Sequence, residues 1–188
     1  MPPEAARCLP GNDGYLRARL RGSIDSDLDW RNQDTQCTGA VRPTDGGIRM
    51  RFTHAGTSKD QRLVLVFGIA KLSEGQAARN VPVNVTLIRE GAGEFYGTQG
   101  DDKCMFDEVQ QTPLKGIPLR ERSYRVVVRG FCTEPARALT GDGAIFISRF
   151  DFAGRVDFET LDEEKPPASK TTNPPQSAAA DLPKAAHP

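Results

Sequence analysis

The chain has 188 residues, which is enough for one domain or at most two small ones. Lysine plus arginine and aspartate plus glutamate number 25 each, so the net charge is zero and composition offers no electrostatic basis for binding nucleic acid. Hydrophobic residues make up only 37%, and no stretch approaches the roughly 20 apolar residues of a transmembrane helix. We therefore expect no nucleic-acid partner and no transmembrane helix.

The first predicted strand starts near residue 16. Leu16, Ala18, Leu20 and Ile24 alternate with polar residues, which is typical of a strand with one buried face. If the strand continues in register, Trp30 lies in the core; the alternative is a stacking platform for a sugar ring. The outer face would then be basic at one end and acidic at the other. It would carry Arg17, Arg19, Arg21, Asp25, Asp27 and Asp29.

Further period-two or apolar segments follow, separated by turn residues. They predict strands at residues 48–53, 63–69, 83–88, 94–98, 104–109, 124–132 and 144–158. Residues 63–69 are apolar on both faces, which indicates a central strand. The last run keeps Phe146, Phe150 and Phe152 on one face and is too long for an ordinary strand, so we expect a bulge or bend at Ala153-Gly154. Residues 133–139 predict one short helix, and residues 71–79 a further helical turn.

About eight strands with at most two short helices favour an antiparallel β-sandwich, with a partly closed β-barrel as the alternative. We expect residues 1–13 to form a lead-in and residues 14–160 the folded domain. Residues 161–188 are rich in proline and alanine and lack aromatic side chains. Such a segment buries too little apolar surface to fold, so it is predicted to be a disordered tail.

Four cysteines, Cys8, Cys37, Cys104 and Cys132, lack the spacing of a zinc site. An even number spread through a β-rich chain predicts a disulfide framework; buried free thiols are the alternative. Of the three connectivities, pairing of sequence neighbours, 8 with 37 and 104 with 132, is the simplest. Disulfides would place the protein outside the cytosol, in the periplasm, in the medium or on the cell surface. The first residues contain no apolar leader segment, and Ala6-Arg7 before Cys8 argues against lipidation of that cysteine.

Asp25, Asp27 and Asp29 form a weak candidate calcium site, because hard cations prefer several carboxylate oxygens close together. The EF-hand pattern fails, since Trp30 and Gln36 stand where glycine and glutamate are required. No other cofactor is predicted. The alternative is an ordinary charged strand or turn.

Arginines on outer strand faces form a second candidate, a binding surface for carboxylate, phosphate or sulfate groups. The alternative is pairing with acidic residues on neighbouring strands. The predicted surface contains Arg17, Arg19, Arg21, Arg49 and Arg51.

Catalytic motifs are scarce. His54 and His187 are the only histidines, and neither a nucleophile elbow nor a zinc-protease motif occurs. A carboxylate pair for glycoside cleavage remains as an alternative, with Glu90, Glu94, Asp107 and Glu108 as candidates. An enzyme is thus less favoured than a binding protein.

The sequence therefore predicts a non-catalytic extracytoplasmic binding or structural accessory protein. Its partner would be an anionic polymer such as a polysaccharide, another protein, or a second copy of the chain in a homo-oligomer. The alternatives are a calcium-dependent carbohydrate-binding module and a polysaccharide hydrolase that uses paired carboxylates.

Overall fold

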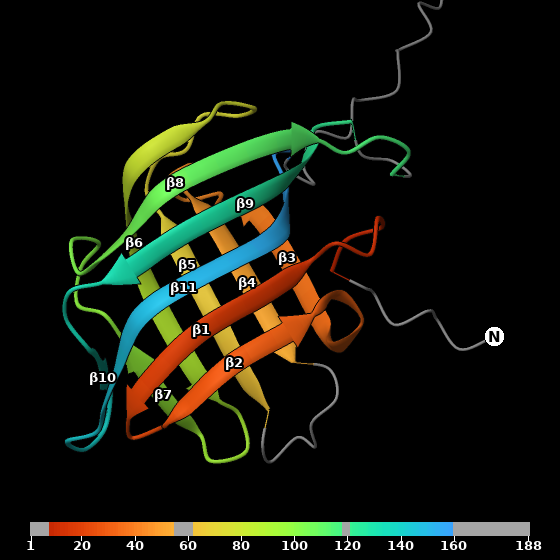
Figure 1. The fold of residues 1–188 in the computed structure, drawn as a ribbon. Coiled ribbons are helices and arrows are strands. Elements are labelled where there is room, and N and C mark those ends of the chain that lie inside the picture. Colours follow the sequence, from red (N-terminus) through yellow and green to blue (C-terminus); the bar gives the residue numbers. More distant parts are fainter. Residues whose placement is uncertain (1–7, 55–61, 118–120, 160–188) are drawn as a thin grey trace, which may run out of the picture.

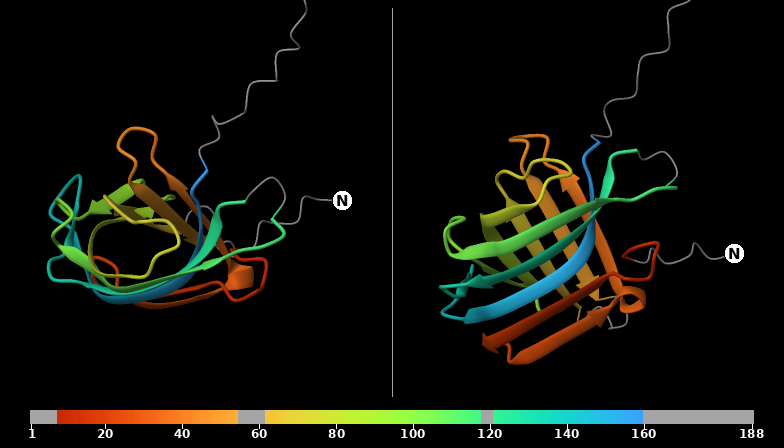
Figure 2. Two further views of the ribbon diagram at one scale, coloured as in Figure 1. Left: turned by 90° about the horizontal axis from the view of Figure 1, so that it is seen from above. Right: turned by 45° about the horizontal axis from the view of Figure 1, so that its top comes forward.

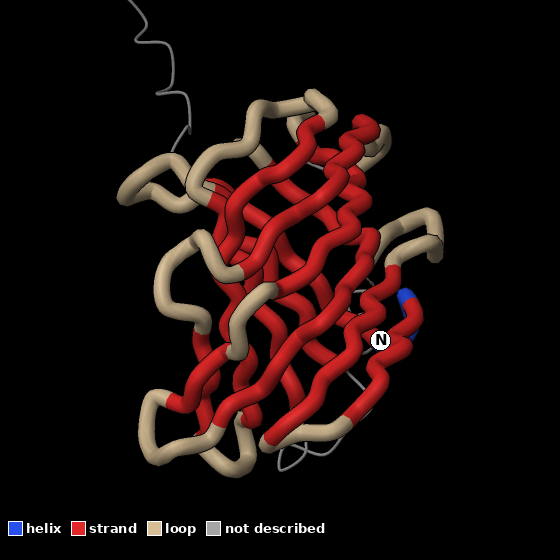
Figure 3. Tube along the Cα trace, turned by 60° about the vertical axis from the view of Figure 1, so that its left-hand side comes forward, coloured by secondary structure: helices blue, strands red, loops and turns tan. Residues whose placement is uncertain are grey.

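The computed structural model describes residues 8–54, 62–117 and 121–159. These residues form strands joined by loops and a single turn of 3₁₀ helix, η1 (Figures 1 and 3). In chain order the elements are β1 (Tyr15–Gly22), β2 (Ser26–Arg31), η1 (Asn32–Asp34), β3 (Thr35–Val41), β4 (Ile48–His54), β5 (Leu63–Ile69), β6 (Ala78–Arg89), β7 (Glu94–Gly97), β8 (Cys104–Pro113), β9 (Ser123–Cys132), β10 (Ala136–Ala138) and β11 (Ala144–Asp157).

Seven of the strands close into a barrel, so the prediction of a sandwich is wrong. The hydrogen-bonded order β6, β5, β4, β3, β11, β9, β8 returns to β6, and the ring is visible from above in Figure 2. β3 meets β11 in parallel at Ala40 and Asp157, whereas the other neighbours in the ring are antiparallel. Alternating hydrophobicity in the sequence indicates which face of each strand is buried. It does not indicate whether the two end strands of a sheet, here β6 and β8, pair with each other and close a barrel.

Four more strands, β1, β2, β7 and β10, lie alongside the barrel. β11 joins them because its length lets it pair with different strands along its course. Its first residues pair with β10 and β1, and its last residues pair with β9 and β3. β1 and β2 thereby extend the sheet of β8, β9 and β11, which faces the viewer in Figure 1.

Phenylalanine rings fill the barrel. Phe67 on β5 lies at its centre, with ring centroids 4.8–6.0 Å from the centroids of four others, Phe52, Phe106, Phe150 and Phe152. All five side chains are fully buried. Residues 63–69 thus form the central strand that the sequence predicts. Trp30 is also buried, as its predicted core position requires, although it lies on β2.

Barrel closure depends on glycine at the joint between β3 and β11. A Cβ atom added to Gly39 would lie 2.3 Å from the backbone oxygen of Arg155. A Cβ on Gly154 would lie 2.7 Å from the ring of Phe52. The absence of side chains at these two positions lets β11 approach β3 and the phenylalanine cluster.

A register shift in β11 moves one predicted core residue to the surface. Arg19 pairs with Arg149 and Leu20 with Ile147, so Ser148 is an extra residue in β11. Of the predicted bulge or bend at Ala153-Gly154, the bulge is wrong, because pairing with β9 is continuous there. The extra residue reverses the alternation, so Ile145 and Ile147 face inward and Phe146 is exposed.

Both predicted helical segments are extended or irregular. Ala136–Ala138 form β10, which pairs with β7 and β11, and Ala136 is buried. Pairing with two strands outweighs the helix-start signal of Thr133 and Pro135. Residues 71–77 form a loop, and Ala78 and Arg79 already belong to β6.

The two disulfides join Cys8 to Cys37 and Cys104 to Cys132, which confirms the predicted pairing. Among the residues described there is no free cysteine. The first bridge fastens the predicted lead-in to β3, and the neighbouring Leu9 is fully buried. The predicted tail, residues 161–188, lies outside the described residues.

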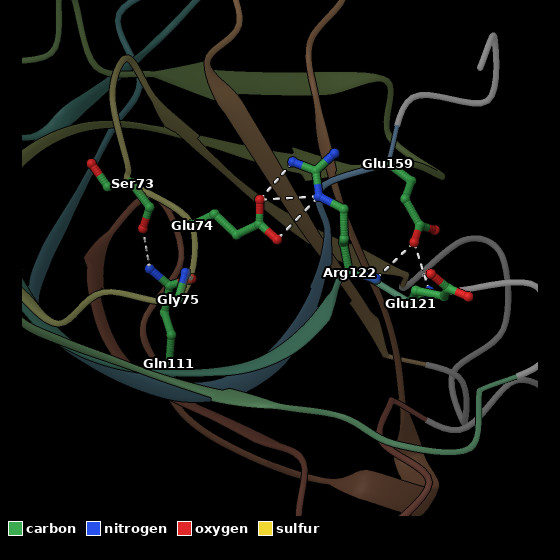
Figure 4. A network of polar contacts seen from close by, with 7 residues as sticks. All are labelled: Ser73, Glu74, Gly75, Gln111, Glu121, Arg122 and Glu159. Atoms are coloured by element: carbon green, nitrogen blue, oxygen red, sulfur yellow. Dashed lines mark hydrogen bonds and ion pairs between the residues drawn. The ribbon is translucent and has the colours of Figure 1, made fainter.

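The loop between β5 and β6 crosses one end of the barrel (Figure 2) and is fastened there by polar contacts (Figure 4). We call residues 70–77 the end strap. The amide of Gln111 donates to the backbone oxygens of Ser73 and Gln76, at 2.8 Å each. The Glu74 carboxylate accepts hydrogen bonds from the guanidinium of Arg122, which holds the pKa of that carboxyl below its usual range.

The strap predicts a pH-dependent contribution to stability. Replacing Glu74 with glutamine is expected to lower the free energy of unfolding at pH 7 by about 0.5–1 kcal/mol, the size of a partly exposed ion pair. Because the pKa of Glu74 is lowered on folding, this stabilisation is complete above its ordinary value of 4.5 and disappears as the pH falls through the lower folded value. Urea denaturation of the wild type and Glu74→Gln between pH 7 and 3 measures this, with Glu121→Gln as the control. A difference that does not shrink as the pH falls below 4.5 would contradict the assignment.

Candidate functional site

The candidate site begins with a hairpin that the sequence pattern did not reveal. β1 does not continue through the aspartates, because the chain turns after Gly22, whose φ is +121°. The three aspartates therefore return beside the arginines. The guanidinium of Arg17 lies 3.2 Å from the Asp29 carboxylate, and that of Arg21 lies 2.8 Å from the Asp27 carboxylate.

A row of alternating charges crosses five strands on the outer face. Strand register aligns Asp29 on β2, Arg17 on β1, Asp151 on β11, Arg129 on β9 and Glu108 on β8. Arg17 contacts both of its acidic neighbours, and a nitrogen of Arg129 lies 4.0 Å from an oxygen of Glu108. We call the outer surface of β2, β1, β11, β9 and β8 the charged face.

The next row breaks the alternation. Asp27 on β2 lies opposite Arg19 on β1, but Arg19 in turn lies opposite Arg149 on β11. Arg19 contacts Asp27 at 3.7 Å, whereas no carboxylate in the described chain pairs with the exposed Arg149. Like charges directly opposite each other on neighbouring strands are destabilising. Arg149 is therefore the cation on this face that an added anion would stabilise most.

Arg149 also lines two adjoining hollows. The larger, about 490 Å³, has side chains of both charges, a hydroxyl and an aromatic ring along its wall. Its lining side chains are Asp107, Arg129, Phe131, Ser148, Arg149 and Asp151. The smaller hollow, about 170 Å³, lies between Arg149 and the β1–β2 hairpin and is lined in part by Arg19 and Asp27.

Two β-bulges flank the larger hollow, one on each side of β9. Ser148 is the extra residue in β11, and Asp107 is the extra residue in β8, where Phe106 pairs with Gly130 and Glu108 with Arg129. Bulges redirect side chains and are frequent beside functional sites. Each bulge here adds one polar side chain to the same hollow.

The structure uses two of the three predicted calcium ligands, Asp27 and Asp29, in ion pairs. The hydrogen bond from Arg21 holds the pKa of Asp27 below its usual range, and Asp29 binds Arg17. Asp25 lies in the turn, where its carboxylate accepts a hydrogen bond from the backbone N–H of Gly22. The described residues contain no group of three or more acidic, histidine or cysteine side chains arranged for a metal.

The five predicted surface arginines do not form one surface. Arg17, Arg19 and Arg21 lie on the charged face, but Arg49 and Arg51 lie on β4 in the opposite wall of the barrel (Figure 1). Arg51 contacts Glu90 at 3.2 Å, while Arg49 is exposed without an ion pair among the described residues. This arginine provides a matched control for Arg149.

The four predicted catalytic carboxylates are also divided between the walls. Glu90 binds Arg51 and Arg62, and Glu94 binds Arg89, all on the far side from β8 and β9. Asp107 and Glu108 lie together on β8, where only Asp107 lines the larger hollow. The structure thus brings Asp107 toward Asp151 rather than toward Glu90 or Glu94.

Four residues at the centre of the site are absent from the predicted set: Phe131, Ser148, Arg149 and Asp151. The alternation of polar and apolar residues is enough to place Arg149 and Asp151 on the outer face, because Phe150 and Phe152 beside them face the core. Ser148 and Asp107 share a hollow only because of the bulges, which leave no clear pattern in the sequence.

The comparisons supply no relative. No protein-family model, curated protein or solved structure matches the chain. In the residues described, no helix has the length and apolar character needed to cross a bilayer.

Proposed function

We propose that this protein is a non-catalytic extracytoplasmic binding protein that holds an anionic polysaccharide on its charged face. The observation that carries the proposal is the pair of facing arginines, Arg19 and Arg149. A carboxylate or sulfate group placed between them would replace repulsion with two charge-assisted hydrogen-bonding partners.

The shape of the face supports a chain ligand. The two hollows adjoin at Arg149 and Asp151, so together they form an extended depression across the strands from β8 to β2. Guanidinium groups bind carboxylates and sulfates in planar, two-point contacts. Acidic side chains interleave with the arginines, which disfavours the dense phosphate backbone of nucleic acid.

The cysteines support the proposed compartment. Two disulfides indicate an oxidising environment outside the cytosol. Polysaccharides of the periplasm, the cell surface and the surrounding medium are the anionic polymers available there. We therefore propose one of these locations.

Removal of the facing arginines tests the proposal. Affinity electrophoresis of the oxidised full chain through gels containing dextran sulfate or polygalacturonate should show retardation that is absent with neutral dextran. Arg19→Gln and Arg149→Gln are each expected to weaken binding about tenfold, the value of one charged contact. Arg49→Gln, which removes an exposed arginine from the opposite wall, should bind like the wild type.

Two binding results would contradict the proposal. One is the absence of retardation by both acidic polymers at low salt, where electrostatic attraction is strongest. The other is equal loss of affinity in Arg49→Gln and Arg149→Gln, which would indicate diffuse charge rather than a site. Release of reducing sugar from either polymer would show that the protein is an enzyme.

A further inference from the structure

We infer that the larger hollow selects a sugar acid, so that the polymer on the charged face contains uronic acid residues. This inference rests on the proposed function and names its ligand class. The charges in the hollow do not suit a simple anion. Alongside Arg129 and Arg149, the hollow contains the carboxylates of Asp107 and Asp151, which repel a phosphate or sulfate.

The two carboxylates differ in their partners. Asp151 lies 3.7 Å from Arg17 across the strands. Asp107 is exposed, and no cation among the described residues pairs with it. The hollow therefore offers one unpaired guanidinium, on Arg149 in β11, and one unpaired carboxylate, on Asp107 in β8, on opposite sides of β9.

Backbone irregularity on two strands gives Asp107 its position. Asp107 is the bulged residue relative to β9. On β6, Arg79 pairs with Glu108 and Val81 with Phe106, so Asn80 lies opposite Asp107, and Asn80 has a φ of +53°. A left-handed residue inside a strand is uncommon, and such backbone strain often accompanies functional sites.

The aromatic ring supplies the third contact. Phe131 lines the hollow and keeps 39% of its surface exposed, although Val126, Val128 and Cys132 on the same strand are buried. An exposed ring beside charged groups provides an apolar surface for the C–H face of a sugar. A polyphosphate or a sulfate cluster has no corresponding apolar face.

A uronic acid residue matches all these groups. Its carboxylate would bind Arg149 on the side that faces Arg19, which lies opposite it on β1. Its ring hydroxyls would donate to the Asp107 carboxylate and bond with the Ser148 hydroxyl. Its ring would lie against Phe131. Asp107, Phe131 and Arg149 are exposed and Ser148 is half-buried, and neither Arg149 nor Asp107 has an ionic partner among the described residues.

Substitution of Asp107 distinguishes sugar recognition from simple charge attraction by the sign of its effect. The experiment is isothermal titration of the oxidised full chain with trigalacturonate, and separately with inorganic triphosphate. If Asp107 accepts hydroxyl hydrogen bonds, Asp107→Asn weakens trigalacturonate binding about fivefold, despite the removal of a negative charge. If the hollow only attracts anions, the same change strengthens binding.

Two matched pairs of variants complete the design. Phe131→Ala should weaken trigalacturonate binding about fivefold, the value of a modest stacking contact. Phe95→Ala, which removes a ring of similar exposure from β7, should leave it unchanged. Asp142→Asn, an exposed aspartate in a loop, is the control for Asp107→Asn. Thermal melts of all variants report folding.

The inference predicts that trigalacturonate binds at least tenfold more tightly than triphosphate and that both hollow variants bind it more weakly. It is overturned if triphosphate binds equally well, if Asp107→Asn binds more tightly, or if Phe131→Ala has no effect. In those cases retention by dextran sulfate through Arg149 would still support the proposed function. The absence of binding to both dextran sulfate and trigalacturonate would overturn both.

Discussion

Replacing Phe67 with alanine is expected to lower the free energy of unfolding by about 4 kcal/mol. Its ring packs against four other phenylalanine rings in the barrel, with centroid distances of 4.8 Å to Phe152 and 5.1 Å to Phe150. Truncation would leave a cavity that the four neighbouring rings, held on three different strands, cannot fill. Thermal unfolding should show a midpoint about 10 °C lower.

Phe95 offers the control for this substitution. It has the same side chain on β7 but keeps 43% of its surface exposed. Phe95→Ala should change the free energy of unfolding by less than about 0.5 kcal/mol. Similar losses in both variants would contradict the placement of Phe67 at the centre of the core.

Removal of the disulfide between β8 and β9 is expected to cause the second large loss of stability. Cys104 and Cys132 are buried, pair directly across the two strands and close a loop with a sequence separation of 28 residues. The chain-entropy model gives about 3.5 kcal/mol for a loop of that size. The double variant Cys104→Ala/Cys132→Ala is expected to lose roughly that amount in guanidinium denaturation.

Reduction of the wild-type protein checks the same contribution by another route. The Cys8–Cys37 bridge has a similar separation, 29 residues, so the two double variants should lose similar stability. Unchanged denaturation after reduction, with four thiols confirmed by alkylation, would show that the bridges do not stabilise the fold.

The faces of the strands were predictable from the sequence, but the connections between them were only partly so. Alternation correctly placed Leu16, Leu20 and Trp30 in the core and the arginines of β1 outside. The turn after Gly22 was missed, because alternation of charge continues through Asp25, Asp27 and Asp29 whether or not the strand reverses. Because the chain reverses, Asp27 and Asp29 lie beside the arginines of β1 and form ion pairs with them.

Closure and bulges escaped prediction for a related reason. Both depend on how strands distant in sequence meet. Gly39 lies against the backbone of Arg155, which is more than 100 positions away in the sequence. A single glycine in a strand does not indicate which distant strand packs beside it. Likewise, Ser148 looks like an ordinary strand residue until its pairing with β1 is known. The predicted binding set was therefore incomplete where the fold itself assembles the site.

The most direct test of the account is to map the bound polymer on the protein by NMR. Amide resonances of the ¹⁵N-labelled, oxidised chain would be followed during titration with trigalacturonate. If the charged face is the binding site, the shifts are confined to it and are largest near Asp107, Phe131 and the bulge at Ser148-Arg149. Shifts centred on Arg49 and Arg51 in β4, or no shifts at millimolar ligand, would contradict it.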